Sequence, residues 1–116
     1  MLALLAAGTA CVLRRRAAAR PPAGRLDPKL HAWFEKATNR FGVNCCGVAD
    51  GRVVTARFDM AVGAWRVLLE GGWQYVPPDK VLDHYPPFPD GSAVVWTDHA
   101  GPRPYIYCFV PPAGAG

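Results

Sequence analysis

The chain has 116 residues, of which 51% are hydrophobic and 19% are charged, and this balance excludes an intrinsically disordered protein. A chain of this length has room for one small domain, whose core gains from a covalent cross-link. The net charge of +4 is unevenly placed: residues 1–42 hold eight Lys and Arg against two Asp and Glu, whereas residues 43–116 hold five against seven. A nucleic-acid interface would therefore depend on the N-terminal arm alone.

The first 25 residues form an apolar and then basic arm. Residues 1–13 carry no charged side chain, and four arginines follow them: Arg14, Arg15, Arg16 and Arg20. A thirteen-residue helix is about 20 Å long, short of the ~30 Å hydrocarbon core, so we expect no full membrane span. We interpret residues 1–25 as a signal remnant or an anchor whose arginines can meet a membrane surface or nucleic acid. The segment Gly8-Thr9-Ala10-Cys11 also resembles a lipidation box, which leaves lipidation of Cys11 open.

One amphipathic helix is predicted over residues 28–41. Asp27 can cap its N-terminus, and Pro28 suits the first helical position because its missing N–H would have no partner there in any case. Apolar side chains then recur at helical spacing, and Gly42 supplies the stop. These apolar residues are Leu30, Trp33, Phe34, Ala37 and Phe41.

From Val43 onward the apolar residues recur with a period of two, which predicts strands. The expected strands are 43–48, 52–58, 64–69, 73–76, 93–97 and 105–110. Asp50-Gly51 and Gly71-Gly72 are predicted hairpin turns. The five prolines of residues 77–89 exclude a central strand and predict a surface loop, with one helical turn near residues 79–82.

These elements predict an α+β fold. The N-terminal helix packs on a small antiparallel β meander, or on an open barrel, of five to six short strands. Residues 26–112 are the single β-rich domain, and residues 113–116 are a flexible tail.

The cysteines predict a disulfide staple and an oxidising compartment. Cys45 and Cys46 are neighbours in an expected strand, so their side chains point to opposite faces and cannot both reach Cys108. One of the two is expected to bridge to Cys108, and the sequence does not decide which. The other is free, paired with another chain or paired with Cys11. In the last strand we expect Cys108, Ile106 and Val110 to share the core face.

No pattern of residues supports catalysis or a metal site. Cys45, Cys46 and Cys108 with a histidine do not match the ligand spacing of zinc sites. Asp83-His84 and Asp98-His99 lie in loops rich in Pro and Gly, where Asp commonly serves turn formation. We therefore predict no enzyme, no cofactor and no small-molecule substrate.

The aromatic residues of the expected strands are too many for one face of a small sheet. Some must lie outside, and an exposed aromatic patch usually marks an interface. The predicted partner-binding residues are Trp73, Tyr75, Tyr105, Tyr107 and Phe109.

Four segments carry a resemblance: Trp33-Phe34, Cys45-Cys46 followed by Asp50, Trp73-x-x-Val76-Pro77, and Cys108-Phe109-x-Pro111. The resulting Cys-Cys…Trp-x-x-Val-Pro…Cys-Phe-x-Pro pattern is similar to that of a family of short uncharacterised proteobacterial proteins, over residues 30–112. Those proteins are generally predicted to be exported and are often prophage-associated. The resemblance implies export and disulfides, and it implies no activity.

The predicted function is that of a non-enzymatic, exported, small interaction module, periplasmic or secreted. A disulfide staples it, and it binds a protein partner through exposed aromatic residues. The alternative is a structural component of a phage virion or another large assembly, in which neighbouring subunits order the basic arm.

Overall fold

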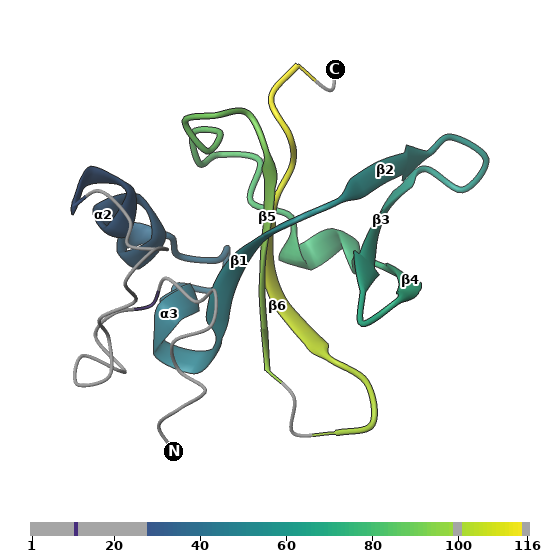
Figure 1. Cartoon of the computed structure of the whole chain (residues 1–116), viewed down its shortest axis with the longest axis horizontal. Coiled ribbons are helices and arrows are strands. Elements are labelled where there is room, and N and C mark those ends of the chain that lie inside the picture. The colour runs from purple at the N-terminus through teal and green to yellow at the C-terminus, as the bar shows by residue number, and fades with distance from the viewer. Residues whose placement is uncertain (1–10, 12–27, 99–100, 115–116) are drawn as a thin grey trace.

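The computed structural model describes residue 11 and residues 28–98 and 101–114, which form three layers (Figure 1). Two short helices lie on one side of a central antiparallel sheet, and a second antiparallel sheet lies on the other side. The mixed class is as predicted, but two separate three-stranded sheets replace the single meander or barrel. The arm apart from Cys11, with Arg14, Arg15, Arg16 and Arg20, lies outside the described residues.

Helix α2 spans Pro28–Lys36 and is shorter than predicted. Trp33 and Phe34 pack in the core as expected. The chain then turns around Asn39, whose Oδ1 accepts hydrogen bonds from the backbone N–H of Phe41 (2.8 Å) and of Val43 (3.0 Å). This turn removes Phe41 from the helix, so its side chain is 61% exposed rather than part of the apolar face.

The predicted strand at residues 43–48 is wrong, because Cys45–Val48 forms the single helical turn α3. The backbone N–H of Cys45 donates to Ala37 O at 2.9 Å, and Ala49 N–H donates to Cys45 O at 3.0 Å. Neighbouring side chains on a helix diverge by about 100° rather than 180°. Both cysteines are therefore buried at once, which strand alternation in a one-sided sheet would not allow.

The central sheet has the order β1-β5-β6, with β1 at Asp50–Val54, β5 at Ala93–Asp98 and β6 at Tyr105–Val110. Asp50 pairs with Thr97, so the predicted hairpin turn at Asp50-Gly51 is wrong. Gly51 serves packing instead. A Cβ at this position would lie 2.8 Å from Phe34 Cδ1 and 2.8 Å from Trp96 Nε1.

The second sheet has the order β2-β3-β4, with β2 at Ala56–Asp59, β3 at Ala64–Leu69 and β4 at Gly72–Tyr75. The single strand predicted over residues 52–58 is interrupted at Thr55, which lets the chain pass from one sheet to the other. The predicted hairpin near Gly71 is present. Glu70 and Gly71 both have positive φ (52° and 83°), as a two-residue turn between strands requires.

A β-bulge at Tyr107 changes the faces of β6. Trp96 pairs with Cys108 and Thr97 pairs with Ile106, so Tyr107 is the extra residue. Cys108 and Val110 face the helices, whereas Ile106 and Phe109 face the second sheet. The predicted common face of Ile106, Cys108 and Val110 is therefore wrong.

Two disulfides join the helical layer to the rest of the chain. Cys45 is bonded to Cys108, and Cys46 is bonded to Cys11. All four cysteines are buried. The pairing decides which neighbour reaches Cys108, and because Cys11 is bonded through sulfur its thiol is not available for a lipid thioether. Disulfides in a chain of this size indicate a non-reducing compartment.

Both faces of the central sheet are covered, so β5 is buried along almost its whole length. Toward the helices lies a core cluster that includes Phe34, Phe88, Val94 and Trp96. Toward the second sheet lies a cluster that contains Val67, Leu69, Val76, Ala93, Val95, Ile106 and Phe109.

The proline-rich loop covers the free edge of β6. It begins with the 3-10 turn η2 at Pro78–Lys80, close to the helical turn expected there. Val81 forms a parallel bridge with Phe109, and Leu82 N–H donates to Phe109 O at 2.8 Å. The loop thereby pairs with backbone groups at the edge of β6 that would otherwise be open to pairing with another chain.

Candidate binding site

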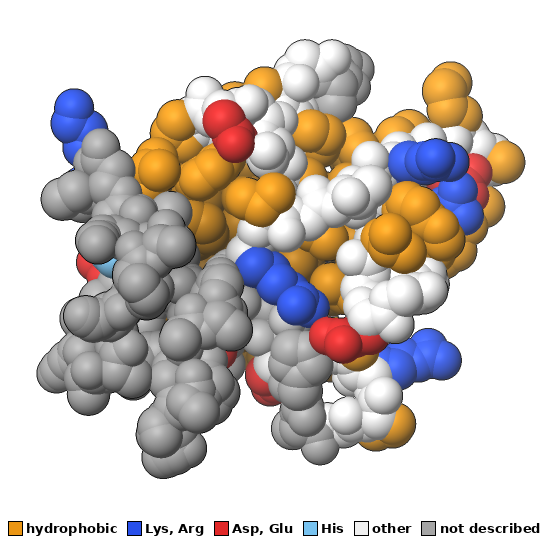
Figure 2. Space-filling view, in the orientation of Figure 1, with side chains coloured by type: hydrophobic (Ala, Val, Ile, Leu, Met, Phe, Trp, Pro, Cys, Tyr) orange, Lys and Arg blue, Asp and Glu red, His pale blue; other side chains and the backbone are white. Residues whose placement is uncertain are grey.

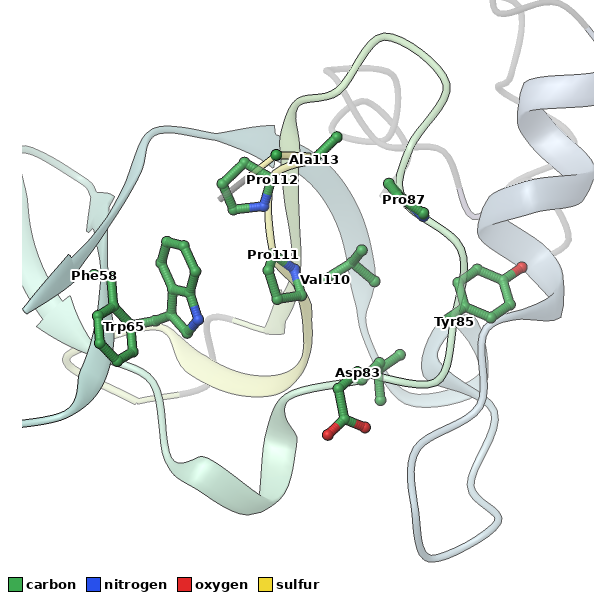
Figure 3. Close-up of a pocket in the computed structure, with 11 residues that line it drawn as sticks. Phe58, Trp65, Asp83, Tyr85, Pro87, Val110, Pro111, Pro112 and Ala113 are labelled. Carbon is green, nitrogen blue, oxygen red and sulfur yellow. The ribbon is translucent and has the colours of Figure 1, made fainter. Parts of the chain in front are cut away.

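An open cleft of about 550 Å³ lies between the β2–β3 hairpin, the proline-rich loop and the C-terminal segment (Figure 3). Aromatic, aliphatic and proline residues dominate its lining. The lining residues are Phe58, Trp65, Leu82, Asp83, Tyr85, Pro87, Val110, Pro111, Pro112, Ala113 and Gly114. We call this feature the aromatic cleft.

The hairpin supplies one wall of the aromatic cleft. Phe58 of β2 and Trp65 of β3 are paired in register, and their rings meet edge to face with centroids 5.3 Å apart. The Trp65 ring also packs on the fully buried Phe109, with centroids 5.6 Å apart. This wall is therefore anchored in the core between the two sheets.

The opposite wall is fixed to helix α2. The Tyr85 hydroxyl donates to the backbone oxygen of Trp33, and Trp33 Nε1–H donates to Pro86 O at 3.1 Å. The rings of Trp33 and Tyr85 lie 5.2 Å apart. Burial raises the pKa of Tyr85 above its ordinary value, so the hydroxyl keeps its proton, and with it this hydrogen bond, to a higher pH than a free tyrosine would.

The C-terminal segment closes the cleft on a third side. After β6 it carries Pro111 and Pro112, which have no backbone N–H. Ala113 N–H donates to Gly91 O at 3.0 Å, and Gly91 N–H donates to Phe88 O at 2.8 Å, so the segment is tied to the loop before β5. Figure 3 shows these prolines facing the space between Trp65 and Tyr85.

Asp83 is the only charged residue of the lining, and its side chain is exposed. The cleft therefore suits an apolar group that carries a positive charge near one end. In the part of the chain that the structure describes, no group of three His, Cys, Asp or Glu residues could hold a metal ion.

A second surface lies on the outer face of the β2-β3-β4 sheet, and it holds two of the predicted partner-binding residues. Trp73 is 41% exposed and Tyr75 is 49% exposed. The guanidinium carbons of Arg57 and Arg66 lie 5.3 and 5.2 Å from the Trp73 ring centroid. Figure 2 shows apolar and basic side chains side by side over this sheet.

Asp59 links this surface to the hairpin turn. The Tyr75 hydroxyl donates to Asp59 Oδ2 at 2.7 Å, and Arg66 Nε lies 4.0 Å from the same oxygen. The hydrogen bond from Tyr75 is the main cause that lowers the pKa of Asp59, and backbone N–H donors and the charge of Arg66 act in the same direction. The same hydrogen bond raises the pKa of Tyr75.

The other three predicted residues lie on the central sheet. Tyr105 is exposed, and its ring meets the Tyr107 ring with centroids 4.7 Å apart. Tyr107 donates to Asp98 Oδ2 at 2.9 Å, which raises the pKa of Tyr107. Phe109 has no exposed surface, so its prediction as a contact residue is wrong. The bulge at Tyr107 turns Phe109 into the core between the sheets.

The aromatic cleft was not predicted from the sequence. Phe58, Trp65 and Tyr85 belong to segments that lie far apart in the chain, and the alternation of a strand does not show which strands face each other across a gap. The prolines at 111 and 112 gave the one local signal, because they end β6 and cannot continue it.

Comparisons of the chain with protein-family models, curated proteins and solved structures found no match. The resemblance to exported proteobacterial proteins therefore stays a prediction. Within the described residues, no helix has the length and hydropathy needed to cross a bilayer.

Proposed function

We propose that this protein is a non-enzymatic binding module, periplasmic or secreted, that holds an apolar segment of a protein partner in the aromatic cleft. One observation carries the proposal: an open cleft is walled by three aromatic rings and several prolines, with a single carboxylate among them. Pockets of this size with apolar walls and few polar groups are typical binding sites.

The rigidity of the walls supports binding of an extended peptide. Trp65 is held against Phe109, and Tyr85 is held against Trp33 on both its ring and its hydroxyl. Aromatic side chains that are already fixed lose little conformational entropy when a ligand covers them. An apolar side chain of the partner then enters between the walls, and a neighbouring Lys or Arg meets Asp83.

The lining supports binding rather than catalysis. Asp83 is its only carboxylate, and the Tyr85 hydroxyl is already a donor to Trp33 O. General acid–base chemistry needs a titratable group placed within reach of the reacting atom and a second group that orients or complements it. The described lining contains Asp83 but no second titratable group that could orient or complement it.

The proposal is tested by panning a random peptide library on the oxidised full-length protein. Enriched peptides are expected to combine a large apolar residue with a nearby Lys or Arg. Asp83→Lys should lower the affinity for the selected peptides by about tenfold, because an attractive charge pair becomes repulsive. Asp79→Lys is the matched control, since it makes the same charge change outside the cleft. Failure to enrich related peptides, or equal binding by Asp83→Lys, would contradict the proposal.

A second candidate function, a structural subunit of a virion or another large assembly, is favoured by one observation. The Cys11–Cys46 disulfide ties a residue within the arm to the body, with a sequence separation of 35 residues. A chain processed after residue 25 would leave Cys46 without this partner. If the arm is retained, its arginines stay with the folded domain and can meet neighbouring subunits; they are Arg14, Arg15, Arg16 and Arg20. Cross-linking of the arm to a second copy in purified particles would support this alternative.

A further inference from the structure

The β2–β3 hairpin projects from the body (Figure 1), and its tip carries exposed apolar side chains. The tip consists of residues 60–63, between the paired ends of the strands at Asp59 and Ala64. Met60 is 83% exposed and Val62 is 60% exposed, and among the described residues only Phe41 has a large hydrophobic side chain of comparable exposure. Apolar side chains at a projecting end cannot be covered by their own domain, so they indicate a surface that meets another apolar medium.

Three backbone N–H groups of the tip donate hydrogen bonds to Asp59. Ala61 N–H donates to Asp59 Oδ1 at 3.0 Å. The N–H groups of Val62 and Gly63 donate to Asp59 O at 3.3 and 2.8 Å. An unpaired polar group is costly to move out of water. Because three successive N–H groups already end on Asp59, the tip can enter an apolar medium without leaving these donors unpaired.

Basic side chains lie directly behind the tip. Arg57 and Arg66 are paired across β2 and β3, two residues from Asp59 and Ala64, and both sit over the Trp73 ring. In the described part of the chain Arg57 has no ion pair, whereas the carboxylate of Asp59 is engaged by the Tyr75 hydroxyl and Ala61 N–H. The same carboxylate lies 4.0 Å from Arg66 Nε, so two guanidinium groups stand against one carboxylate, and the net charge at this end of the hairpin is positive.

We propose that the hairpin tip docks on the surface of an anionic phospholipid bilayer. Met60 and Val62 enter the boundary of the acyl chains, and Arg57 and Arg66 meet the phosphate groups. Met60 lies three positions after Arg57, at most about 10 Å of extended chain, which matches the ~5–10 Å depth to which interfacial segments bury their apolar side chains. Trp73 is an amphipathic ring of the kind that is enriched at the headgroup level.

The choice of a bilayer over a protein pocket rests on the combination of these features. A convex tip with only two strongly exposed apolar side chains fills little of a protein pocket, whereas lipid adapts to its shape. A pair of arginines behind the tip matches the charge of anionic headgroups, each contributing to the attraction near the surface.

The test is co-flotation of the oxidised full-length protein with vesicles, either of phosphatidylcholine alone or of phosphatidylcholine and phosphatidylglycerol in equal parts. The wild-type protein is expected to float with the mixed vesicles. Met60→Ser/Val62→Ser should lower the partition coefficient by about tenfold, since two apolar side chains are lost from the buried surface. Arg57→Gln should lower binding to the mixed vesicles by about fivefold and leave binding to phosphatidylcholine unchanged.

Val43→Ser/Val53→Ser is the matched control, because it removes two exposed apolar side chains outside the hairpin and keeps the arm. This variant should bind the mixed vesicles as the wild type does. Wild-type protein that floats with neither vesicle would overturn the proposal. Equal binding by Met60→Ser/Val62→Ser would overturn it too, and would place the lipid contact in the basic arm. If Met60→Ser/Val62→Ser no longer bound a peptide or protein ligand but still floated with the vesicles, the tip would be a protein contact instead.

Discussion

Gly51 shows how one residue sets the distance between the helical layer and the central sheet. Its missing side chain lets the Phe34 ring and the Trp96 indole approach the backbone of β1. These two rings belong to an aromatic cluster with Trp33 and Phe88, in which neighbouring ring centroids lie 4.9–5.8 Å apart. The cluster also fixes Trp33, which in turn holds Tyr85 at the cleft.

Gly51→Ala is therefore expected to destabilise the protein by about 1–3 kcal/mol, because the new Cβ forces both rings to move in a packed core. Gly47→Ala is the control: a Cβ there meets nothing closer than 3.8 Å. Urea unfolding of the oxidised proteins measures both. Equal stability of the two variants would contradict the packing role of Gly51.

The carboxylate of Asp59 accepts hydrogen bonds from both the hairpin turn (Ala61 N–H) and the outer face of the second sheet (Tyr75 hydroxyl). Its folded-state pKa is lowered, first by the hydrogen bond from Tyr75. A lowered pKa stabilises the fold above the unfolded-state value, and this contribution is lost as the pH falls through the folded-state value. Tyr75→Phe removes the hydrogen bond, so the pKa of Asp59 should rise. A carboxyl-detected NMR titration measures it, and an unchanged pKa would contradict the assigned cause.

At the scale of elements, the β3–β4 turn depends on a left-handed backbone at Gly71, where φ is 83°. Gly71→Ala should lower the free energy of unfolding by about 1 kcal/mol, because a Cβ is disfavoured in this region. Gly72→Ala is the neighbouring control, since Gly72 lies in strand β4 and a Cβ there would meet only Leu69 O, at an ordinary contact distance of 3.9 Å. Urea unfolding again separates them. A larger loss for Gly72→Ala would mean that the turn lies elsewhere.

Several elements were predictable from the sequence because local signals and tertiary pairing agree. The strands at residues 64–69, 93–97 and 105–110 match β3, β5 and β6 closely, since alternation and turn residues mark both of their ends. Residues 43–48 were mispredicted as a strand because two buried cysteines in succession satisfy no period of two. In the structure, backbone hydrogen bonds close a helical turn there, and both of its cysteines are disulfide-bonded.

The cleft and the two-sheet arrangement were not predictable for a different reason. The break at Thr55 is one residue long, and nothing in the local pattern of residues 52–58 marks the change of sheet. The bulge at Tyr107 also shifts every later side chain of β6 to the opposite face. Tyr107 therefore packs toward the helices and Phe109 toward the second sheet, although strand alternation alone would place both on one face.

At the scale of the whole molecule, the disulfides connect segments that lie far apart in the sequence. The Cys45–Cys108 bond spans 63 residues and joins α3 to β6. In the chain-entropy model, a loop of this length stabilises the fold by about 4 kcal/mol, a large share of the stability of a domain this small.

Cys45→Ala/Cys108→Ala should therefore lower the free energy of unfolding by about 4 kcal/mol, and urea unfolding followed by intrinsic fluorescence measures the loss. Asn44→Ala is a control on the same segment, because it removes only an exposed hydrogen bond to Glu35 O (2.7 Å). A double variant as stable as the wild type would show that packing alone specifies the position of α3.

The most direct test of an extracytoplasmic module with a retained arm is the intact mass of the protein from its native source, with and without reduction. Each disulfide gains two hydrogens on reduction, so two disulfides predict an increase of about 4 Da. The measured chain should also contain Cys11, because Cys11 pairs with Cys46. An unchanged mass on reduction, or a mature chain that begins after Cys11, would contradict this account.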